Sequence, residues 1–267
     1  MQSIRKAGVA CNMLQRQHMS ASRPRRPTSL SDVRATIISC HACPRLRTYC
    51  VEVGRAKKAA FREDIYWAKP VPGFGDPAAR VLLLGLAPAA HGANRTGRVF
   101  TGDGVGASGD FLMAALNRAG FANISTSQRI DDGLVLTDAY IAAAVRCAPP
   151  ANKPLPEEID RCLPHLIDEV AHLPNLQVVV ALGKIAWDTW LKVCAMRGVK
   201  IPRPRPAFAH GAIAQLAPPH PAPGTPAPLP PCTLIGAYHP SRQNTNTGVV
   251  TPKMYDAVFR RVRQSLR

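Results

Sequence analysis

The chain has 267 residues, 46% of them hydrophobic, which is enough for one medium-sized domain with a substantial core. Its 34 Lys and Arg residues outnumber 17 Asp and Glu, so the formal net charge is +17 and the first expected partner is a nucleic acid. No apolar run approaches the ~20 residues of a membrane span, and no secretory signal is evident. We therefore expect a cytoplasmic protein without a membrane partner, although a basic charge that serves only solubility is an alternative.

The N-terminal segment differs in composition from the rest of the chain. Residues 1–30 contain no acidic residue and predict a disordered basic arm, although an organellar transit peptide has a similar composition. Order is expected to begin at Ser31 or Asp32, which can cap a helix. A single α/β domain is predicted over residues 31–267, with a proline-rich surface insertion at 202–231.

Four apolar runs followed by loops predict strands, at residues 81–84, 139–145, 178–182 and 233–238. Helical patterns lie between and after these runs. Strands that alternate with helices predict a three-layer α/β/α sandwich with a central, mainly parallel four-stranded sheet.

Capping residues and prolines indicate where three of these helices begin. Ser108 or Asp110 is expected to cap the helix that follows the first strand. Thr251 is expected to cap the last helix. Another helix is expected to begin at Pro156, and Pro164 predicts either a kink or a new start within it.

The loop after the first strand is the strongest candidate for a binding site. Its sequence, GLAPAAHGANRTGRVFTGD, leaves the carboxyl end of a strand, where parallel α/β sheets bind ligands. Its glycines allow close backbone approach, and its polar side chains suit acid–base chemistry and phosphate binding. An ordinary glycine-rich turn is the alternative, because such loops are weak signals taken singly.

Four of the eight cysteines form two candidate metal-binding pairs. Cys40 and Cys43 have C-x2-C spacing, Cys147 lies just past a strand, and Cys162 lies near a helix start. Zinc and a [4Fe–4S] cluster both accept four cysteines, and the spacing does not choose between them. Eight structural thiols are the alternative, and the cysteines that look spare are Cys11, Cys50, Cys194 and Cys232.

Three segments resemble the signatures of the B-type, family 5 uracil-DNA glycosylases: GLAPAAHGANRTGRVFTGD, YIAAAVRCAPP, and AYHPS with Asn244. The paired cysteines resemble that family's iron–sulfur ligands. The resemblance implies an α/β/α fold, a structural [4Fe–4S] cluster, and removal of damaged bases from single- or double-stranded DNA in base excision repair. A monomer associated with the nucleoid is expected.

The resemblance directs attention to residues suited to cutting an N-glycosidic bond, for which the base must first be flipped into a pocket. Asp103 can stabilise the sugar cation or orient the attacking water, and His239 can hydrogen-bond the departing base. Phe100 can stack on the base, and the backbone around Ala87 can contact its oxygens. Structural roles are the alternatives: a helix cap for Asp103, a buried histidine, and a core phenylalanine.

Further residues of the same segments are expected to contact the substrate. Arg95, Arg98, Ser241 and Arg242 would hold phosphates or fill the space that the flipped nucleotide leaves. Asn244 resembles a family position near the catalytic histidine, so a substrate-binding role is also expected for it.

Two positions depart from the related A-type enzymes, which place Glu at Leu86 and Asn at Ala143. Without these polar readers, Ala143 would line a less selective pocket that accepts hypoxanthine, xanthine or ethenocytosine beside uracil. No Lys stands out as a Schiff-base nucleophile, so a monofunctional enzyme that leaves an abasic site is predicted. The rivals are a non-catalytic nucleic-acid-binding protein with a structural iron–sulfur or zinc site, and a nucleotide-binding enzyme, whose phosphate fingerprint is missing.

Overall fold

A six-stranded sheet forms the centre of the protein, whose computed structural model describes residues 27–216 and 231–266. The strands are β1 (Phe74–Gly75), β2 (Val81–Gly85), β3 (Ala139–Ala143), β4 (Val178–Leu182), β5 (Ile213–Leu216) and β6 (Cys232–Ala237). Their spatial order is β1-β3-β2-β4-β6-β5. The four inner strands are parallel, and the two edge strands pair antiparallel to their neighbours.

The register of the inner strands brings their carboxyl ends to one edge of the sheet. Gly85 of β2 is paired with Ala143 of β3, and Leu182 of β4 with Ala237 of β6. All four inner strands are fully buried, which is expected of parallel strands covered on both faces. The loops that leave these strands therefore converge above the same edge.

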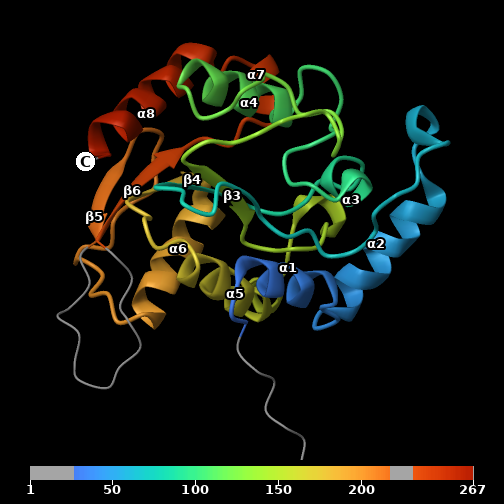
Figure 1. Ribbon diagram of the computed structural model, residues 1–267, viewed down its shortest axis with the longest axis horizontal. Coiled ribbons are helices and arrows are strands. Elements are labelled where there is room, and N and C mark those ends of the chain that lie inside the picture. The colour runs from blue at the N-terminus through green and yellow to red at the C-terminus, as the bar shows by residue number, and fades with distance from the viewer. Residues whose placement is uncertain (1–26, 217–230, 267) are drawn as a thin grey trace, which may run out of the picture.

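Helices cover both faces of the sheet and complete the predicted three-layer sandwich, with α4 and α8 on one side and α1, α5 and α6 on the other (Figure 1). The helices are α1 (Leu30–Ile38), α2 (Pro44–Ala56), α3 (Ala93–Thr96), α4 (Ser108–Arg118), α5 (Pro156–Ala171), α6 (Lys184–Met196), α7 (Arg242–Asn246) and α8 (Pro252–Ser265). Short 3-10 turns occur at Ala59–Phe61 and Pro150–Asn152. Among the described residues, no helix has the length and apolarity needed to cross a membrane.

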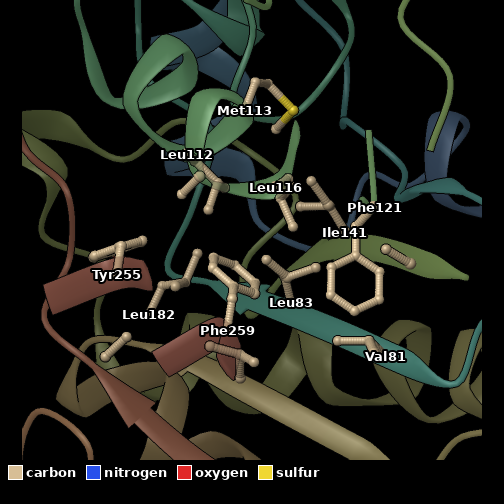
Figure 2. Close-up of a cluster of buried hydrophobic side chains, with 14 of the residues drawn as sticks. Val81, Leu83, Leu112, Met113, Leu116, Phe121, Ile141, Leu182, Tyr255 and Phe259 are labelled. Carbon is tan, nitrogen blue, oxygen red and sulfur yellow. The ribbon is translucent and has the colours of Figure 1, made fainter. Parts of the chain in front are cut away.

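The core on the α4/α8 side of the sheet is built from large aliphatic and aromatic side chains (Figure 2). Leu112 and Leu116 of α4 and Phe259 of α8 face Leu83 and Ile141 of the central strands, and each is no more than 1% exposed. Burying one such side chain contributes about 1.5–3 kcal/mol. This packing fixes the start of α4, which follows the glycine-rich loop, against the sheet.

The structure corrects the predicted number of strands and one helix start. The four predicted parallel strands are present, but β1 and β5 extend the sheet, and β5 lies inside the segment predicted as a proline-rich insertion. Residues 217–230 of that segment lie outside the described residues, as does most of the predicted basic arm. Helix α1 starts earlier than expected because Ser29 caps it, accepting a hydrogen bond from the Asp32 backbone at 3.1 Å.

Of the two outcomes predicted at Pro164, a new helix start does not occur, because α5 is a single helix from Pro156 to Ala171. Proline removes one backbone donor from a helix interior and usually kinks it. Here Leu163 and Leu166, on either side of the proline, are 2% and 0% exposed. Their packing in the core holds the helix together across the defect.

The start of α4 also differs from the prediction, since neither Ser108 nor Asp110 is its N-cap. The N-cap is Ala107, which makes no side-chain capping bond. The Asp110 carboxylate instead accepts hydrogen bonds from the backbone of Gly106 at 2.9 Å and of Ser127 at 3.0 Å. Asp110 therefore ties the glycine-rich loop to a second loop.

Candidate active site

A cavity of about 400 Å³ opens at the carboxyl edge of the sheet, among the loops that follow β2, β3 and β6. Seven residues predicted from the sequence line it: Ala87, Phe100, Asp103, Ala143, His239, Ser241 and Arg242. The remaining lining residues are mostly apolar: Leu86, Ala89, Ala93, Val99, Ala107, Ser108 and Asn152. A mostly apolar cavity of this size with a few polar groups is typical of a small-ligand site and can accommodate a nucleobase.

The Asp103 carboxyl occupies an unusual electrostatic environment within this cavity. Burial raises its pKa to about 6, Arg242 and Arg95 oppose this rise, and Asp110 adds to it. Two arginines fix the backbone here: Arg95 Nη2 donates to the Gly102 carbonyl at 2.6 Å and Arg242 Nη2 to the Asp103 carbonyl at 3.1 Å. The carboxylate is thus held in place while part of its charge remains uncompensated.

Gly92 is the close neighbour that allows Asp103 to sit where it does. A Cβ added at Gly92 would lie 1.7 Å from Asp103 Oδ1 and 3.2 Å from the Thr101 carbonyl oxygen. Real Cβ atoms do not approach so closely, so only glycine leaves room for the carboxylate. A glycine at position 92 therefore allows the beginning of the loop to lie directly against its end at Asp103.

Phe100 and His239 form one wall of the cavity. Their rings are stacked, with centroids 5.8 Å apart and planes inclined at 27°. Phe100 has a φ of +53°, a strained conformation for a bulky residue, and its ring lies where a Cβ at Gly85 would come within 2.9 Å. Burial lowers the pKa of His239 to about 4, so its imidazole is neutral at neutral pH.

Asn244 acts on this wall from outside the cavity. Its Nδ2 donates to the His239 carbonyl at 2.8 Å, and its side chain is not among the groups that line the cavity. The geometry therefore assigns Asn244 to positioning His239 and gives no support to the direct substrate contact expected from the sequence. Ser241 caps the short helix α7, accepting from the Asn244 backbone at 3.3 Å, and Arg242 is exposed beside the opening.

Arg98 does not lie at the surface as a phosphate-binding residue would. It is 7% exposed and forms an ion pair with Asp132 at 2.7 Å, and it also donates to Thr101 at 2.8 Å and Ser127 at 3.1 Å. The geometry therefore gives no support to the predicted contact of Arg98 with DNA. The hydrogen bonds of its guanidinium group instead connect the loop that contains Thr101 to the loop that contains Ser127 and Asp132.

Arg95 is similarly tied into the structure. It pairs with Asp64, donates to the His91 carbonyl at 2.9 Å, and lies over the Phe61 ring at 3.9 Å from its centroid. Its side chain is only 12% exposed. We therefore assign it to shaping the loop before Asp103 in place of the expected phosphate binding.

Asn152 is a cavity residue that the sequence motifs did not identify. It ends the 3-10 turn after β3 and, like Ala151 before it, has a left-handed backbone, with φ values of +56° and +51°. Among the lining residues it carries the one side-chain amide. A signal was present, because Asn152 lies in a loop that leaves a parallel strand at its carboxyl end, and Asn is among the residues that tolerate positive φ.

The four predicted metal ligands come together at a second place, away from this cavity. Cys40, Cys43, Cys147 and Cys162 line one small space between the start of α2, the end of β3 and α5. In the described part of the chain, however, no three His, Cys, Asp or Glu side chains converge closely enough to hold a metal ion. Cys50, which looks spare in the sequence, packs in one buried cluster with Cys43, Cys147 and Cys162, and its thiol donates to the Ala148 carbonyl at 3.7 Å.

The other cysteines lie elsewhere. Cys194 and Cys232 are buried in the core on the α6 side of the sheet, and Cys11 lies outside the described residues. Neither of the two buried thiols lines the cysteine cavity.

Comparison with known proteins shows to which family this fold and site belong. The model of the uracil DNA glycosylase superfamily matches residues 72–263. Similar proteins include the Type-5 uracil-DNA glycosylase of Thermus thermophilus, 47% identical over 82% of this chain and 90% of its own length. The Type-5 enzymes of Mycobacterium tuberculosis and Mycobacterium leprae are each 44% identical, over 88% and 87% of this chain and 81% and 93% of their own lengths.

These matches span the sheet, the cavity and the loops that line it, so the chain belongs to the uracil DNA glycosylase superfamily. The family and the class of enzyme expected from the sequence resemblance are thereby confirmed, together with the mainly parallel α/β fold. The relatives named above are all of Type 5, in agreement with the family 5 resemblance of the three segments.

Proposed function

We propose that this protein is a monofunctional DNA glycosylase that removes uracil from DNA in base excision repair and leaves an abasic site. The observation that carries the proposal is the meeting of Asp103, Phe100 and His239 around one cavity of nucleobase size. A base inside a duplex cannot reach such a cavity, so it must be flipped out of the helix, at a cost of a few kcal/mol.

Two cavity residues suit the departing base. The Phe100 ring offers a stacking surface for its face. Neutral His239 donates a hydrogen bond to a base oxygen, which stabilises the negative charge that develops there without transferring a proton. The backbone N–H at Ala87, on the loop after β2, is a further donor for a base oxygen.

Asp103 suits the sugar side of the bond. With a pKa of about 6, it is mainly ionised at neutral pH, and a carboxylate can orient the attacking water or stabilise the sugar cation. The cavity-lining residues include no lysine that could form a Schiff base. Attack by water followed by release of the free base is therefore the reaction that this residue set supports.

The apolar lining supports a broad choice of bases. The side chains of Leu86 and Ala143 cannot form hydrogen bonds with the edge of a base, and Asn152 supplies the one side-chain amide among the lining residues. A pocket with few polar readers cannot reject analogues strongly, because strong rejection depends on leaving buried polar groups unpaired. Hypoxanthine, xanthine and ethenocytosine are accordingly proposed as further substrates beside uracil.

We further propose that Cys40, Cys43, Cys147 and Cys162 hold a structural [4Fe–4S] cluster. Their common cavity supports this. So do guanidinium nitrogens of Arg47 and Arg146, two residues that line the same space: these nitrogens have no partner within residues 27–216 and 231–266 and would suit an anionic, sulfur-rich group. Such a cluster would link α2 to the end of β3 and to α5. The protein is proposed to act as a monomer on single- or double-stranded chromosomal DNA in the cytoplasm.

The activity can be tested with oligonucleotides that carry uracil, hypoxanthine, xanthine or ethenocytosine, scored for strand cleavage after alkali. We expect cleavage only after alkali, reduced about 100-fold or more by Asp103→Asn or His239→Ala. Asp131→Asn is the matched control, because Asp131 is exposed and outside the cavity, and it should retain full activity. Folded wild-type protein that binds DNA but leaves every lesion intact would support the non-catalytic binding protein instead.

A further inference from the structure

Two buried arginines beside the cysteine cavity have more N–H donors than acceptors. Arg146 is 1% exposed, and its Nη2 donates to Glu169 Oε2 at 2.5 Å, but its Nε and Nη1 have no partner among the described residues. Arg47 donates through Nη2 to the Ala68 carbonyl at 3.1 Å, and its Nε and Nη1 are likewise buried without a partner in this part of the chain. A buried donor left unpaired costs about 1–3 kcal/mol, and more when it is charged.

Both unpaired groups belong to the space that the four predicted ligands line. Arg146 immediately precedes Cys147 in the segment that follows the end of β3 at Ala143. Arg47 lies one helical turn after Cys43, to whose carbonyl its backbone N–H donates at 3.0 Å. Both arginines line the same space as the four cysteines.

The carboxylate nearest to Arg146 is fully engaged. Glu169 is 1% exposed, and its Oε1 accepts from the Gly73 backbone at 2.8 Å and from the Tyr140 hydroxyl at 3.3 Å. Glu169 therefore balances the charge of Arg146 but offers nothing to Arg47, whose hydrogen-bonded partner is a neutral carbonyl. The cavity carries a net positive charge that calls for an anion with several acceptor atoms.

A cluster held by four thiolates is such an anion, and its sulfur atoms accept hydrogen bonds. We propose that Arg47 and Arg146 donate N–H···S hydrogen bonds to the sulfur atoms of this four-cysteine cluster and so stabilise its negative charge. The inference rests on the cluster proposed above. The two arginines position and tune the cluster and take no part in cutting the glycosidic bond.

This arrangement has a measurable electrochemical consequence. Hydrogen bonds and positive charge favour the more negative, reduced form of a cluster over the oxidised form, and therefore raise its reduction potential. Removing one charged donor should lower the ratio of reduced to oxidised cluster at a given potential about tenfold, since a charged hydrogen bond is worth ~1.5 kcal/mol or more. For a one-electron couple, a tenfold change corresponds to about 59 mV.

The test uses the full-length protein purified with its cluster, with iron and sulfide content, midpoint potential and loss of the cluster's visible absorbance in air as readouts. Arg47→Met should lower the potential and hasten loss of the cluster, and Arg47→Lys, which keeps the charge, should have a smaller effect. Arg55→Met is the matched control, because Arg55 lies on the same helix but is exposed and does not line the cavity. It removes one positive charge without removing a donor to the cluster.

Arg146 needs a paired substitution, because its loss alone would leave Glu169 buried and uncompensated. The double variant Arg146→Met with Glu169→Gln removes both charges and should also lower the potential. If Arg47→Met and this double variant match Arg55→Met in potential and in air stability, the inference fails although the cluster stands. If the wild type contains no iron and sulfide, or contains zinc, the cluster proposal itself fails, while the alkali-cleavage assay still tests the glycosylase.

Discussion

Asp103 is a candidate catalytic residue whose ionised form lowers the stability of the fold. Its carboxyl group is largely buried, and the two nearby arginines offset only part of the cost of ionising it there, so its pKa is raised to about 6. In the unfolded chain the same group titrates near 3.8. Between these values the folded protein binds more protons than the unfolded chain, so the contribution of Asp103 to stability is lost as the pH rises.

Replacing Asp103 by Asn should therefore raise stability at high pH while it reduces activity. At pH 8 we expect a gain on the order of 1–2 kcal/mol, discounted for partial exposure, and a melting temperature higher by several degrees. Below about pH 4 the two proteins should unfold alike, because the carboxyl is then protonated in both states. Thermal melts at pH 4 and pH 8, with exposed Asp131→Asn as the control, would test this; equal shifts at both pH values would contradict it.

The pH dependence of base excision should report the same group. Because Asp103 acts as a carboxylate, the single-turnover rate should rise through about pH 6 and then level off. His239 adds no further step between pH 5 and 8, since burial lowers its pKa to about 4 and it is neutral throughout this range. His239→Gln should lower the plateau but keep the midpoint, whereas Asp103→Asn should flatten the curve. A midpoint that moves in His239→Gln would assign the step to the histidine.

Arg98 and Arg242 both lie in or beside the signature segments, but we expect Arg98 to affect stability and Arg242 to affect DNA binding. Arg98→Met leaves Asp132 buried without its partner and should cost about 2–4 kcal/mol in unfolding free energy, with little effect on the salt dependence of DNA binding. Arg242→Gln should hardly change stability, and it should make the slope of log affinity against log salt shallower by about one. Denaturant unfolding and binding titrations on both variants separate the two roles; a shallower slope in Arg98→Met would restore its predicted role in DNA binding.

These residues also mark what the sequence could reveal. The types of Asp103, Phe100 and His239, and their place at the ends of strands, were enough to identify them as site residues. The partners of Arg95 and Arg98 lie at Asp64 and Asp132, about thirty residues away in opposite directions, and no local pattern reveals such pairs. An arginine in a glycine-rich loop is therefore equally consistent with phosphate binding and with an internal tether.

At the scale of elements, the loop after β2 is built so that its beginning and its end touch at Gly92 and Asp103. Gly92→Ala should displace the carboxylate and lower the excision rate about 100-fold, because even a 1 Å misplacement of a reacting group is costly. Its backbone, with φ −98° and ψ −101°, lies outside the main regions of an L-residue, so some loss of stability is expected as well, and thermal melts must accompany the rate measurement. Gly133→Ala is the control: at φ +77° it costs about 1 kcal/mol in strain, but a Cβ there meets nothing within 4 Å, and the rate should be unchanged.

The elements that the sequence predicted correctly are those with long, regular signals. The four inner strands are continuous apolar runs with Val, Leu and Ile, a pattern that indicates buried parallel strands. The edge strands were missed because β1 has only two residues and β5 alternates in burial beside a proline-rich segment. Such short strands form through pairing with a neighbour that is already in place, and a single sequence does not show that neighbour.

At the scale of the whole molecule, the register of the sheet explains how distant segments form one site. The loops after β2, β3 and β6 contribute Asp103, Asn152 and His239, which are far apart in the sequence. They meet because parallel strands with aligned carboxyl ends deliver all three loops to the same edge. The cysteines meet elsewhere, because two of them lie before the first strand and are brought back beside α5.

The excess of positive charge belongs to the whole chain and should control binding more than chemistry. Six of the basic residues lie within residues 1–26: Arg5, Lys6, Arg16, Arg23, Arg25 and Arg26. Changing all six to Gln in the full-length protein should weaken DNA binding at low salt and make the salt slope shallower by one unit or more, since each phosphate that is no longer neutralised reduces the slope by ~0.9.

The single-turnover rate at saturating enzyme should not change in this variant, because the proposed catalytic residues Asp103 and His239 are unchanged. Binding titrations across salt concentrations provide the measurement, with Arg242→Gln as the reference for removing a single phosphate-binding charge. A lower saturating rate in the six-residue variant would mean that the N-terminal charges assist base flipping itself. An unchanged slope would confine DNA recognition to residues 27–267.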